Sequence, residues 1–104
     1  MAAKSRREQL EEMLADDPDD AFVRYGLAME HVSEGNNEAA VRCLQELIER
    51  SADYVPAYQQ AGQALVRLGR AGEAREMFTR GVAVARQQGN QHAAEEMQGF
   101  LAGL

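Results

Sequence analysis

The chain has 104 residues, a length that suits one compact domain and leaves little room for a second. Apolar residues make up 45% of it and charged residues 27%, a mixture typical of a globular protein with a buried core. The formal net charge of −6 would repel a nucleic-acid backbone, and the short basic group Lys4, Arg6 and Arg7 is too small to recruit a membrane surface. We therefore expect neither nucleic acid nor membrane as a partner.

The cysteine count and the N-terminal residues indicate the cellular compartment in which the protein is expected. Cys43 is the single cysteine, so an intrachain disulfide is excluded and a reducing, cytoplasmic setting fits best. The first residues lead into a charged amphipathic stretch rather than the apolar run of a secretory signal, and no stretch is long and apolar enough to span a membrane.

The first two predicted elements are helices with clear ends. Ser5 and Glu8 have the spacing of a capping box, which predicts a helix that begins there and ends before Pro18. Asp19 or Asp20 is expected to cap a second helix. Gly35 should end that helix, because a residue without Cβ adopts the left-handed conformation at a helix C-terminus.

Four more helices are predicted by the same signals. Asn36 or Asn37 should cap a third helix that runs to about Arg50. Asp53 as a cap and Pro56 in the first turn predict a fourth helix, which Gly69 ends. The remaining two are expected at about Ala71–Gln88 and from Asn90 to Leu104. With no convincing strand pattern, the sequence predicts an all-α protein of about six helices joined by short turns.

The most informative pattern is an internal repeat with a fixed period. The step along the chain from Gly35 to Gly69 also leads from Leu10 to Leu44 and from Leu44 to Phe78. Small and apolar residues thus recur in register, as close packing between neighbouring helices requires. Further sets matched by the same step are Gly69 with Gly103, Ala40 with Ala74, Leu14 with Ile48 and Val82, Leu27 with Ala61, Ala28 with Gly62, and Val32 with Val66.

This repeat register resembles the tetratricopeptide repeat, a helix-turn-helix unit of about 34 residues with an aromatic residue, a small pair and further apolar residues at fixed places. The copy at 55–88 carries that pattern at Tyr58, Ala61, Gly62, Leu65, Gly69, Ala74 and Phe78. The resemblance implies an α-α superhelix of antiparallel hairpins in one domain, 1–104, similar to small stand-alone bacterial proteins of this class. Its parts would be a half-repeat helix at 5–18, repeats at 21–54 and 55–88, and a capping helix at 90–104.

The copy at 21–54 departs from the pattern. Arg24 and His31 stand where bulky apolar residues are usual. An alternative phase places Phe22, Tyr25 and Met29 on the signature positions instead, so that Phe22 and Tyr25 could either pack in the core or face the groove. The sequence leaves these two alternatives open.

Candidate catalytic and metal-binding groups lack partners at the required spacing. Neither His31 nor His92 lies three to five residues from another His, Cys or paired carboxylate in a recognised metal spacing, and Cys43 lacks the His partner and orienting group that a catalytic thiol needs. The acidic group Asp16, Asp17, Asp19 and Asp20 lacks the pattern of a calcium loop and is interpreted as a helix end followed by a cap. We therefore expect no enzyme activity, no cofactor and no metal.

The resemblance implies instead that the first helix of each hairpin lines a concave groove that binds a protein or peptide. Tyr25, Met29 and Gln60 stand where some members carry the Lys, Asn and Arg that bind a C-terminal carboxylate, so that type of partner is not supported. The alternative is a self-assembling unit such as a homodimer, because the half-repeats at both ends each expose a helix flank. The expected groove residues are Tyr25, Met29, Gln59, Gln60, Gln63, Arg67 and Met97, with Phe22, Ser33 and Ala93 on the same surface.

Overall fold

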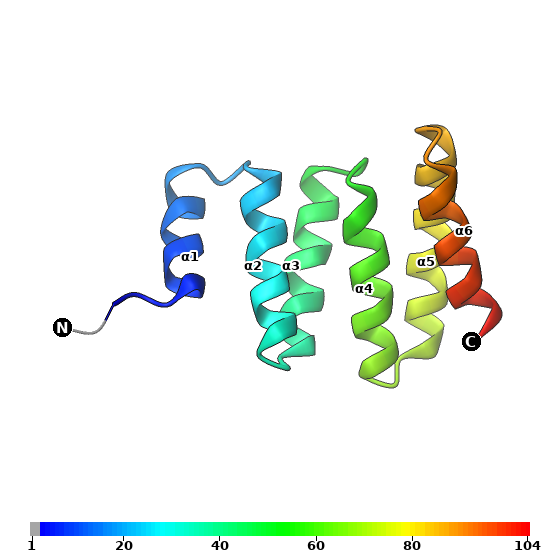
Figure 1. Cartoon of the computed structure of the whole chain (residues 1–104), viewed down its shortest axis with the longest axis horizontal. Coiled ribbons are helices and arrows are strands. Elements are labelled where there is room, and N and C mark those ends of the chain that lie inside the picture. The colour runs from blue at the N-terminus through cyan, green and yellow to red at the C-terminus, as the bar shows by residue number, and fades with distance from the viewer. Residues whose placement is uncertain (1–2) are drawn as a thin grey trace.

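A computed structural model describes residues 3–104, so that residues 1 and 2 of the expected domain lie outside the described part. It consists of six helices, and no strand occurs within residues 3–104 (Figure 1). The helices are α1 (Arg6–Asp16), α2 (Ala21–Ser33), α3 (Asn37–Arg50), α4 (Val55–Arg67), α5 (Ala71–Gln87) and α6 (Gln91–Ala102). The all-α prediction is confirmed, and each predicted helix is present within a few residues of its expected ends.

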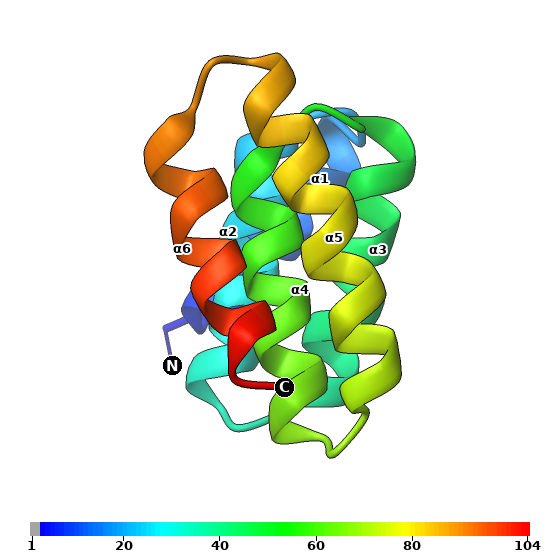
Figure 2. The same ribbon diagram turned by 90° about the vertical axis from the view of Figure 1, so that its right-hand side faces the viewer.

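The helices form an elongated stack in chain order, with overall dimensions of 49 × 28 × 20 Å. Each helix packs on the next one along the chain, from α1 on α2 to α5 on α6. When the stack is viewed from its end, α3 and α5 lie on one side, and α6 lies on the other side with α2 and α4 between (Figure 2). The even-numbered helices are therefore the first helices of successive hairpins, and the odd-numbered helices α3 and α5 are the second.

Three of the four predicted caps are confirmed, at the starts of α1, α2 and α3. Ser5 and Glu8 form the capping box, and the Asp20 carboxylate accepts a hydrogen bond from the Val23 amide at 3.1 Å. Asn36 and Asn90 cap α3 and α6 in the same way. The expected cap at Asp53 is wrong: Tyr54 precedes α4, and no side chain caps that helix. Pro56 in the first turn lacks an amide hydrogen, so fewer donors there require a cap.

Three glycines end helices in the left-handed conformation. Gly35 and Gly69 both have φ of +76°, and Gly89 has φ of +71°. Backbone amides after α2 and α4 close the ends, with the Asn36 amide donating to His31 O and the Arg70 amide donating to Leu65 O. The identical geometry at Gly35 and Gly69, one repeat apart, shows that the period in the sequence is a period in the backbone.

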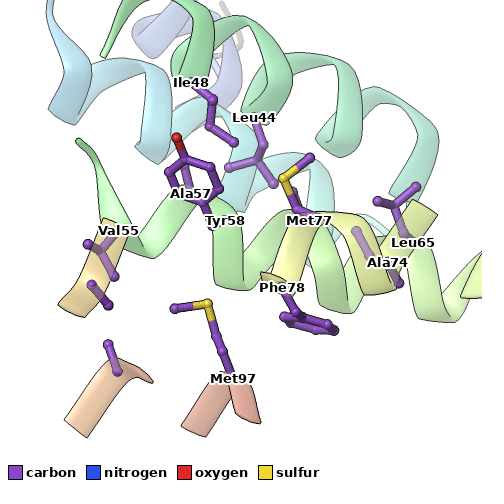
Figure 3. Packing of buried hydrophobic residues seen from close by; sticks show 14 of the residues in the cluster. Leu44, Ile48, Val55, Ala57, Tyr58, Leu65, Ala74, Met77, Phe78 and Met97 are labelled. Carbon is purple, nitrogen blue, oxygen red and sulfur yellow. The ribbon is translucent and has the colours of Figure 1, made fainter. Parts of the chain in front are cut away.

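The main core is formed by α3, α4, α5 and α6, with Ala28 of α2 (Figure 3). Tyr58 and Phe78 are fully enclosed, and the Tyr58 hydroxyl donates to Ala52 O at 2.6 Å. Gly62 is required by the close approach of α4 and α5, because a Cβ there would overlap the Phe78 ring. A Cβ at Gly81 would lie 2.5 Å from Met97 Sδ. The small positions of the repeat are therefore contact points between helices.

A second, smaller core joins α1 to its neighbours. Leu10, Val23 and Leu27 are buried together, with Leu14 and Cys43 packed against them. Ion pairs cross from α1 to α2, where Arg6 Nε lies 3.1 Å from Glu30 Oε1 and Arg7 Nε lies 3.3 Å from Glu34 Oε1. Because α1 packs chiefly on α2, it has far less buried surface than the inner helices.

Candidate partner-binding surface

The first strip of candidate residues lies along α2. The helical spacing of Phe22, Tyr25 and Met29 puts them on neighbouring turns of one face. Phe22 is 77% exposed, so the alternative in which it packs beneath α1 is wrong. Tyr25 and Met29 are half-buried, and Tyr25 packs against the edge of the main core. Ser33 is exposed, and its hydroxyl donates to Glu30 O at 2.8 Å.

The second strip lies along α4 and is polar. Gln59, Gln60 and Gln63 are half-buried, whereas Arg67 is exposed at the end of the helix. Gln59 Nε2 donates to Glu96 Oε2 of α6 at 2.7 Å. Arg67 Nε donates to Asn37 Oδ1 at the start of α3 at 2.8 Å. Two of the four side chains are therefore positioned by neighbouring helices.

Tyr25, Tyr54 and Gln60 connect the two strips. The rings of Tyr25 and Tyr54 have centroids 5.5 Å apart and are tilted by 49°. Burial is the main cause that raises the pKa of the Tyr25 hydroxyl, the neighbouring Tyr54 raises it further, and a hydrogen bond with the Gln60 side chain lowers it. Burial and Asp20 raise the pKa of Tyr54. Because both pKa values are raised, both hydroxyls are neutral in the physiological range.

The predicted continuation of the groove on α6 is wrong. Met97 is 0% exposed and packs against Gly81 of α5, and Ala93 is also buried. The reason is the small residue at Gly81, which lets α6 approach α5 so closely that its inner face is closed. The candidate surface therefore consists of α2 and α4, with Tyr25, Met29, Gln59, Gln60, Gln63 and Arg67 as its predicted residues.

A hollow between α1 and α2 adds residues that the sequence analysis did not assign to a site. Its volume is about 340 Å³, and its wall is mostly apolar. Leu10 and Met13 come from α1, and Gly26 comes from α2 beside the predicted Tyr25 and Met29. The repeat register contained a signal for them, since it pairs Met13 with Leu47 of the inner core. The lining residues are Arg6, Leu10, Met13, Phe22, Val23, Tyr25, Gly26, Met29 and Glu30.

Arg24 is the clearest departure from the repeat pattern, and the structure gives its role. It is 7% exposed at the position that Tyr58 occupies in the next repeat. Its Nε donates to Pro18 O at 2.7 Å, and its Nη1 lies 3.3 Å from Glu46 Oε1. The guanidinium therefore ties the α1–α2 turn to α3, and its bond to Pro18 O corresponds to the bond from the Tyr58 hydroxyl to Ala52 O one repeat later.

The candidate chemical groups Cys43, His31 and His92 lie on three different helices, α3, α2 and α6. Burial is the main cause that raises the pKa of the Cys43 thiol, so the reactive thiolate is disfavoured. His31 is largely covered, and His92 lies exposed 2.5 Å from Glu96. Over the described part of the chain, no three His, Cys, Asp or Glu side chains gather where they could bind a metal ion. None of its helices has the length and apolar character needed to cross a membrane.

Comparison with known proteins agrees with this geometry. Models of the tetratricopeptide repeat match residues 1–69 and residues 55–88. The chain belongs to the tetratricopeptide repeat family. A TPR repeat-containing protein of Pseudomonas aeruginosa is 34% identical over 94 residues, which cover 90% of each chain. Members of this family generally mediate protein–protein interactions and are generally not catalysts.

Solved tetratricopeptide structures have the same arrangement of helices. The solution structure of a tetratricopeptide repeat domain protein from Salinibacter ruber is 37% identical, with a TM-score of 0.78, and the match covers 84% of this chain and 88% of that one. A protein from Bordetella parapertussis is 28% identical, with a TM-score of 0.83 and coverage of 96% and 87%. The family resemblance and the helical-repeat fold are thus confirmed.

Proposed function

We propose that this protein is a scaffold that binds a protein or peptide segment on the face formed by α2 and α4, without a cofactor. The observation that carries the proposal is the half-buried row Gln59, Gln60 and Gln63 on α4, next to Tyr25. The opposite face of α4 is enclosed and apolar, as the repeat requires. A row of amides on the free face is not needed for that packing.

The chemistry of this surface suits an extended peptide. A glutamine amide both donates and accepts, so it can pair with either group of a peptide backbone. Tyrosine and methionine are enriched in protein interfaces, and Tyr25 and Met29 border the row. The hydrogen bonds of Gln59 to Glu96 and of Arg67 to Asn37 hold two of the side chains in place before binding, which lowers the entropy lost on association.

The charge pattern favours a neutral, partly apolar segment as the partner. Tyr25, Met29 and Gln60 occupy the positions where a carboxylate-binding groove would carry Lys, Asn and Arg. The single half-buried Cys43 is consistent with action in the reducing cytoplasm, which we include in the proposal.

The test is selection of binding peptides from a random library, followed by calorimetry with the selected peptide. Tyr25→Ala should weaken binding by about 30-fold if the ring is a hot spot worth ~2 kcal/mol. Gln63→Ala should weaken binding by about 5-fold, the value of one hydrogen bond. Gln45→Ala is the matched control, because Gln45 is an exposed glutamine on α3 outside both strips.

Two outcomes would contradict the proposal. The first is a peptide whose affinity is unchanged by Gln60→Ala, Gln63→Ala and Tyr25→Ala. The second is a Tyr25→Ala protein with a lower melting temperature but unchanged affinity per folded molecule, which would show that Tyr25 is a core residue only.

A further inference from the structure

The hollow between α1 and α2 has a mostly apolar wall, and two large side chains stand beside it. Phe22 is 77% exposed, and Met13 is 52% exposed. Residues of both helices line the hollow, with Leu10 and Gly26 in its wall. We refer to Leu10, Met13, Phe22 and Gly26, with Arg6 and Glu30 at the rim, as the N-terminal seat.

The repeat register shows what kind of group the N-terminal seat accepts. One repeat further along the chain, Met13 corresponds to Leu47 and Arg6 to Ala40, and both of these inner residues are 0% exposed. They lie on α3, which is packed between α2 and α4. In contrast, α1 packs chiefly on α2 alone. Compared with α3, α1 therefore lacks one of two neighbouring helices, and the N-terminal seat is the surface on which that second helix would pack.

The last helix of another copy does not fit this seat. The face by which α4 packs on α5 includes Tyr58 and Gly62, and the register takes these residues to His92 and Glu96 on α6. His92 is 85% exposed and lies 2.5 Å from Glu96. Burying this polar face against apolar residues would leave its charges without solvent, so head-to-tail growth of the stack is disfavoured. The outward face of α6 is that of a solvent-facing cap.

The N-terminal seat is instead complementary to itself. It contains projecting side chains, Phe22 and Met13, next to a recess, as an isologous contact requires. The charged residues that line it are one of each sign, Arg6 on α1 and Glu30 on α2, and they lie at the same height along the helices, 3.1 Å apart. We propose that this seat binds the same seat of a second copy across a two-fold axis parallel to α1 and α2.

In that arrangement α1 of each copy lies against α2 of the other. Residues at equal height then meet, so that Arg6 faces Glu30, Leu10 faces Gly26 and Met13 faces Phe22 of the second copy. The equal heights follow from the contacts within one copy, where Arg6 pairs with Glu30 and Leu10 lies beside Gly26. Balanced rim charges let two chains approach although each has a net charge of −6.

Gly26 supports a close approach of a second chain. A glycine inside a helix destabilises the helix relative to alanine. The packing within one chain does not require this glycine, because a Cβ at Gly26 would lie 3.5 Å from Leu10 Cδ2, an ordinary contact. The inner repeats have Gln60 and Ala94 at this position. A partner helix that packs directly on the backbone of α2 accounts for the glycine.

The dimer is compatible with the peptide-binding proposal, and the two are separable. It would cover Phe22 and the neighbouring part of Tyr25 and Met29, and it would leave the α4 row open. Changes at Met13 or Phe22 test the dimer, whereas changes at Gln63 test the peptide site.

The first experiment is sedimentation equilibrium over about 1–100 μM, a range that spans the expected micromolar dissociation constant. The wild-type chain should be a dimer at the upper end. Phe22→Glu and Met13→Glu should each weaken it by about 30-fold or more, since they put a charge in the apolar centre. Val66→Glu is the control, because Val66 is 44% exposed on α4 outside the seat and should leave the dimer unchanged. Circular dichroism should show equal helix content in all four proteins.

A charge exchange tests the two-fold pairing directly. Arg6→Glu and Glu30→Arg should each weaken self-association about 5-fold, because each places like charges opposite each other. An equimolar mixture of these two variants should associate as well as the wild type. The mixture has no Arg6–Glu30 pair within either chain, so restored association can come only from pairs between chains.

Gly26→Ala should have opposite effects on the stability of the monomer and on the affinity of the dimer. It should stabilise the monomer, since alanine favours the helix, and weaken the dimer about 10-fold by filling the contact point. A wild-type chain that is still monomeric at about 100 μM would overturn the proposal and leave a helix of another protein as the occupant. A dimer that is insensitive to Phe22→Glu, or a charge-exchange mixture that stays monomeric, would overturn it as well.

Discussion

The two ends of the stack differ in the kind of side chain that they expose, although both follow the same repeat register. At the C-terminal end, α6 turns buried Ala93 and Met97 toward α5 and exposed His92 and Glu96 outward. At the N-terminal end, α1 and α2 leave Phe22 and an apolar hollow exposed. One end is therefore closed by a polar face, and the other has the surface of an interrupted core.

This difference shows that a truncated repeat is not by itself a docking surface. Both ends lack one helix of a hairpin, and α6 exposes Phe100 to 39%, but the N-terminal end has Met13 and Phe22 exposed beside an apolar hollow. In a stack where each helix contacts only its neighbours, such residues lower the stability of the end unless another helix covers them. The inner and terminal positions of one register can thus be compared by matched substitutions.

The largest expected effect is at the central register position. Leu44→Ala should destabilise the fold by about 4 kcal/mol, because Leu44 is 0% exposed in the main core. Leu10→Ala, the same change one repeat earlier, should cost about 2 kcal/mol, because Leu10 packs mainly on α2. Urea unfolding in a Phe22→Glu background removes any contribution from assembly. An equal loss in the free energy of unfolding at the two positions would show that α1 is packed as tightly as α3.

A smaller effect is expected where α4 meets α5. Gly62→Ala should destabilise the fold by about 2 kcal/mol, because its Cβ would overlap the enclosed Phe78 ring. Gly72→Ala is the matched control on α5, where a Cβ meets no atom within 4 Å and alanine should be neutral or slightly stabilising. Thermal unfolding of both variants checks the difference. A tolerated Gly62→Ala would mean that the seam adjusts more easily than its packing indicates.

The smallest effect concerns the mobility of α1, with Cys43 as the reporter. Leu14 and Cys43 line the same small hollow, and burial raises the pKa of the Cys43 thiol. Alkylation by iodoacetamide at pH 8 should therefore be slower than for an exposed cysteine, and its rate should still rise with pH beyond 9. Leu14→Ala should speed it about 3-fold and move the pH profile lower, as the thiolate gains water. Leu101→Ala on α6, far from Cys43, should leave the rate unchanged.

The helices and the repeat were predictable because their signals are local. The capping box at Ser5, the glycines Gly35 and Gly69, and the repeat register all follow from residues within one repeat. The cap at Asp53 was wrong because a proline in the first turn removes the need for it.

The candidate surface was predictable only in part. Helical spacing places Tyr25 and Met29 on one face of α2, and the structure agrees. The exposure of Phe22 and the enclosure of Met97 were not predictable, since both depend on how closely a neighbouring helix approaches. Gly81 permits that approach at α6, and no helix covers Phe22 within residues 3–104.

By itself, the sequence determined six helices, their ends and the period at which they stack, because hydrogen-bonded caps, left-handed glycines and small contact residues act over a few positions. Only the tertiary structure decided which apolar side chains lie inside and which lie outside. Exposure is a property of two surfaces in contact, and a residue such as Met13 has the pattern of a core residue whether or not a second helix covers it.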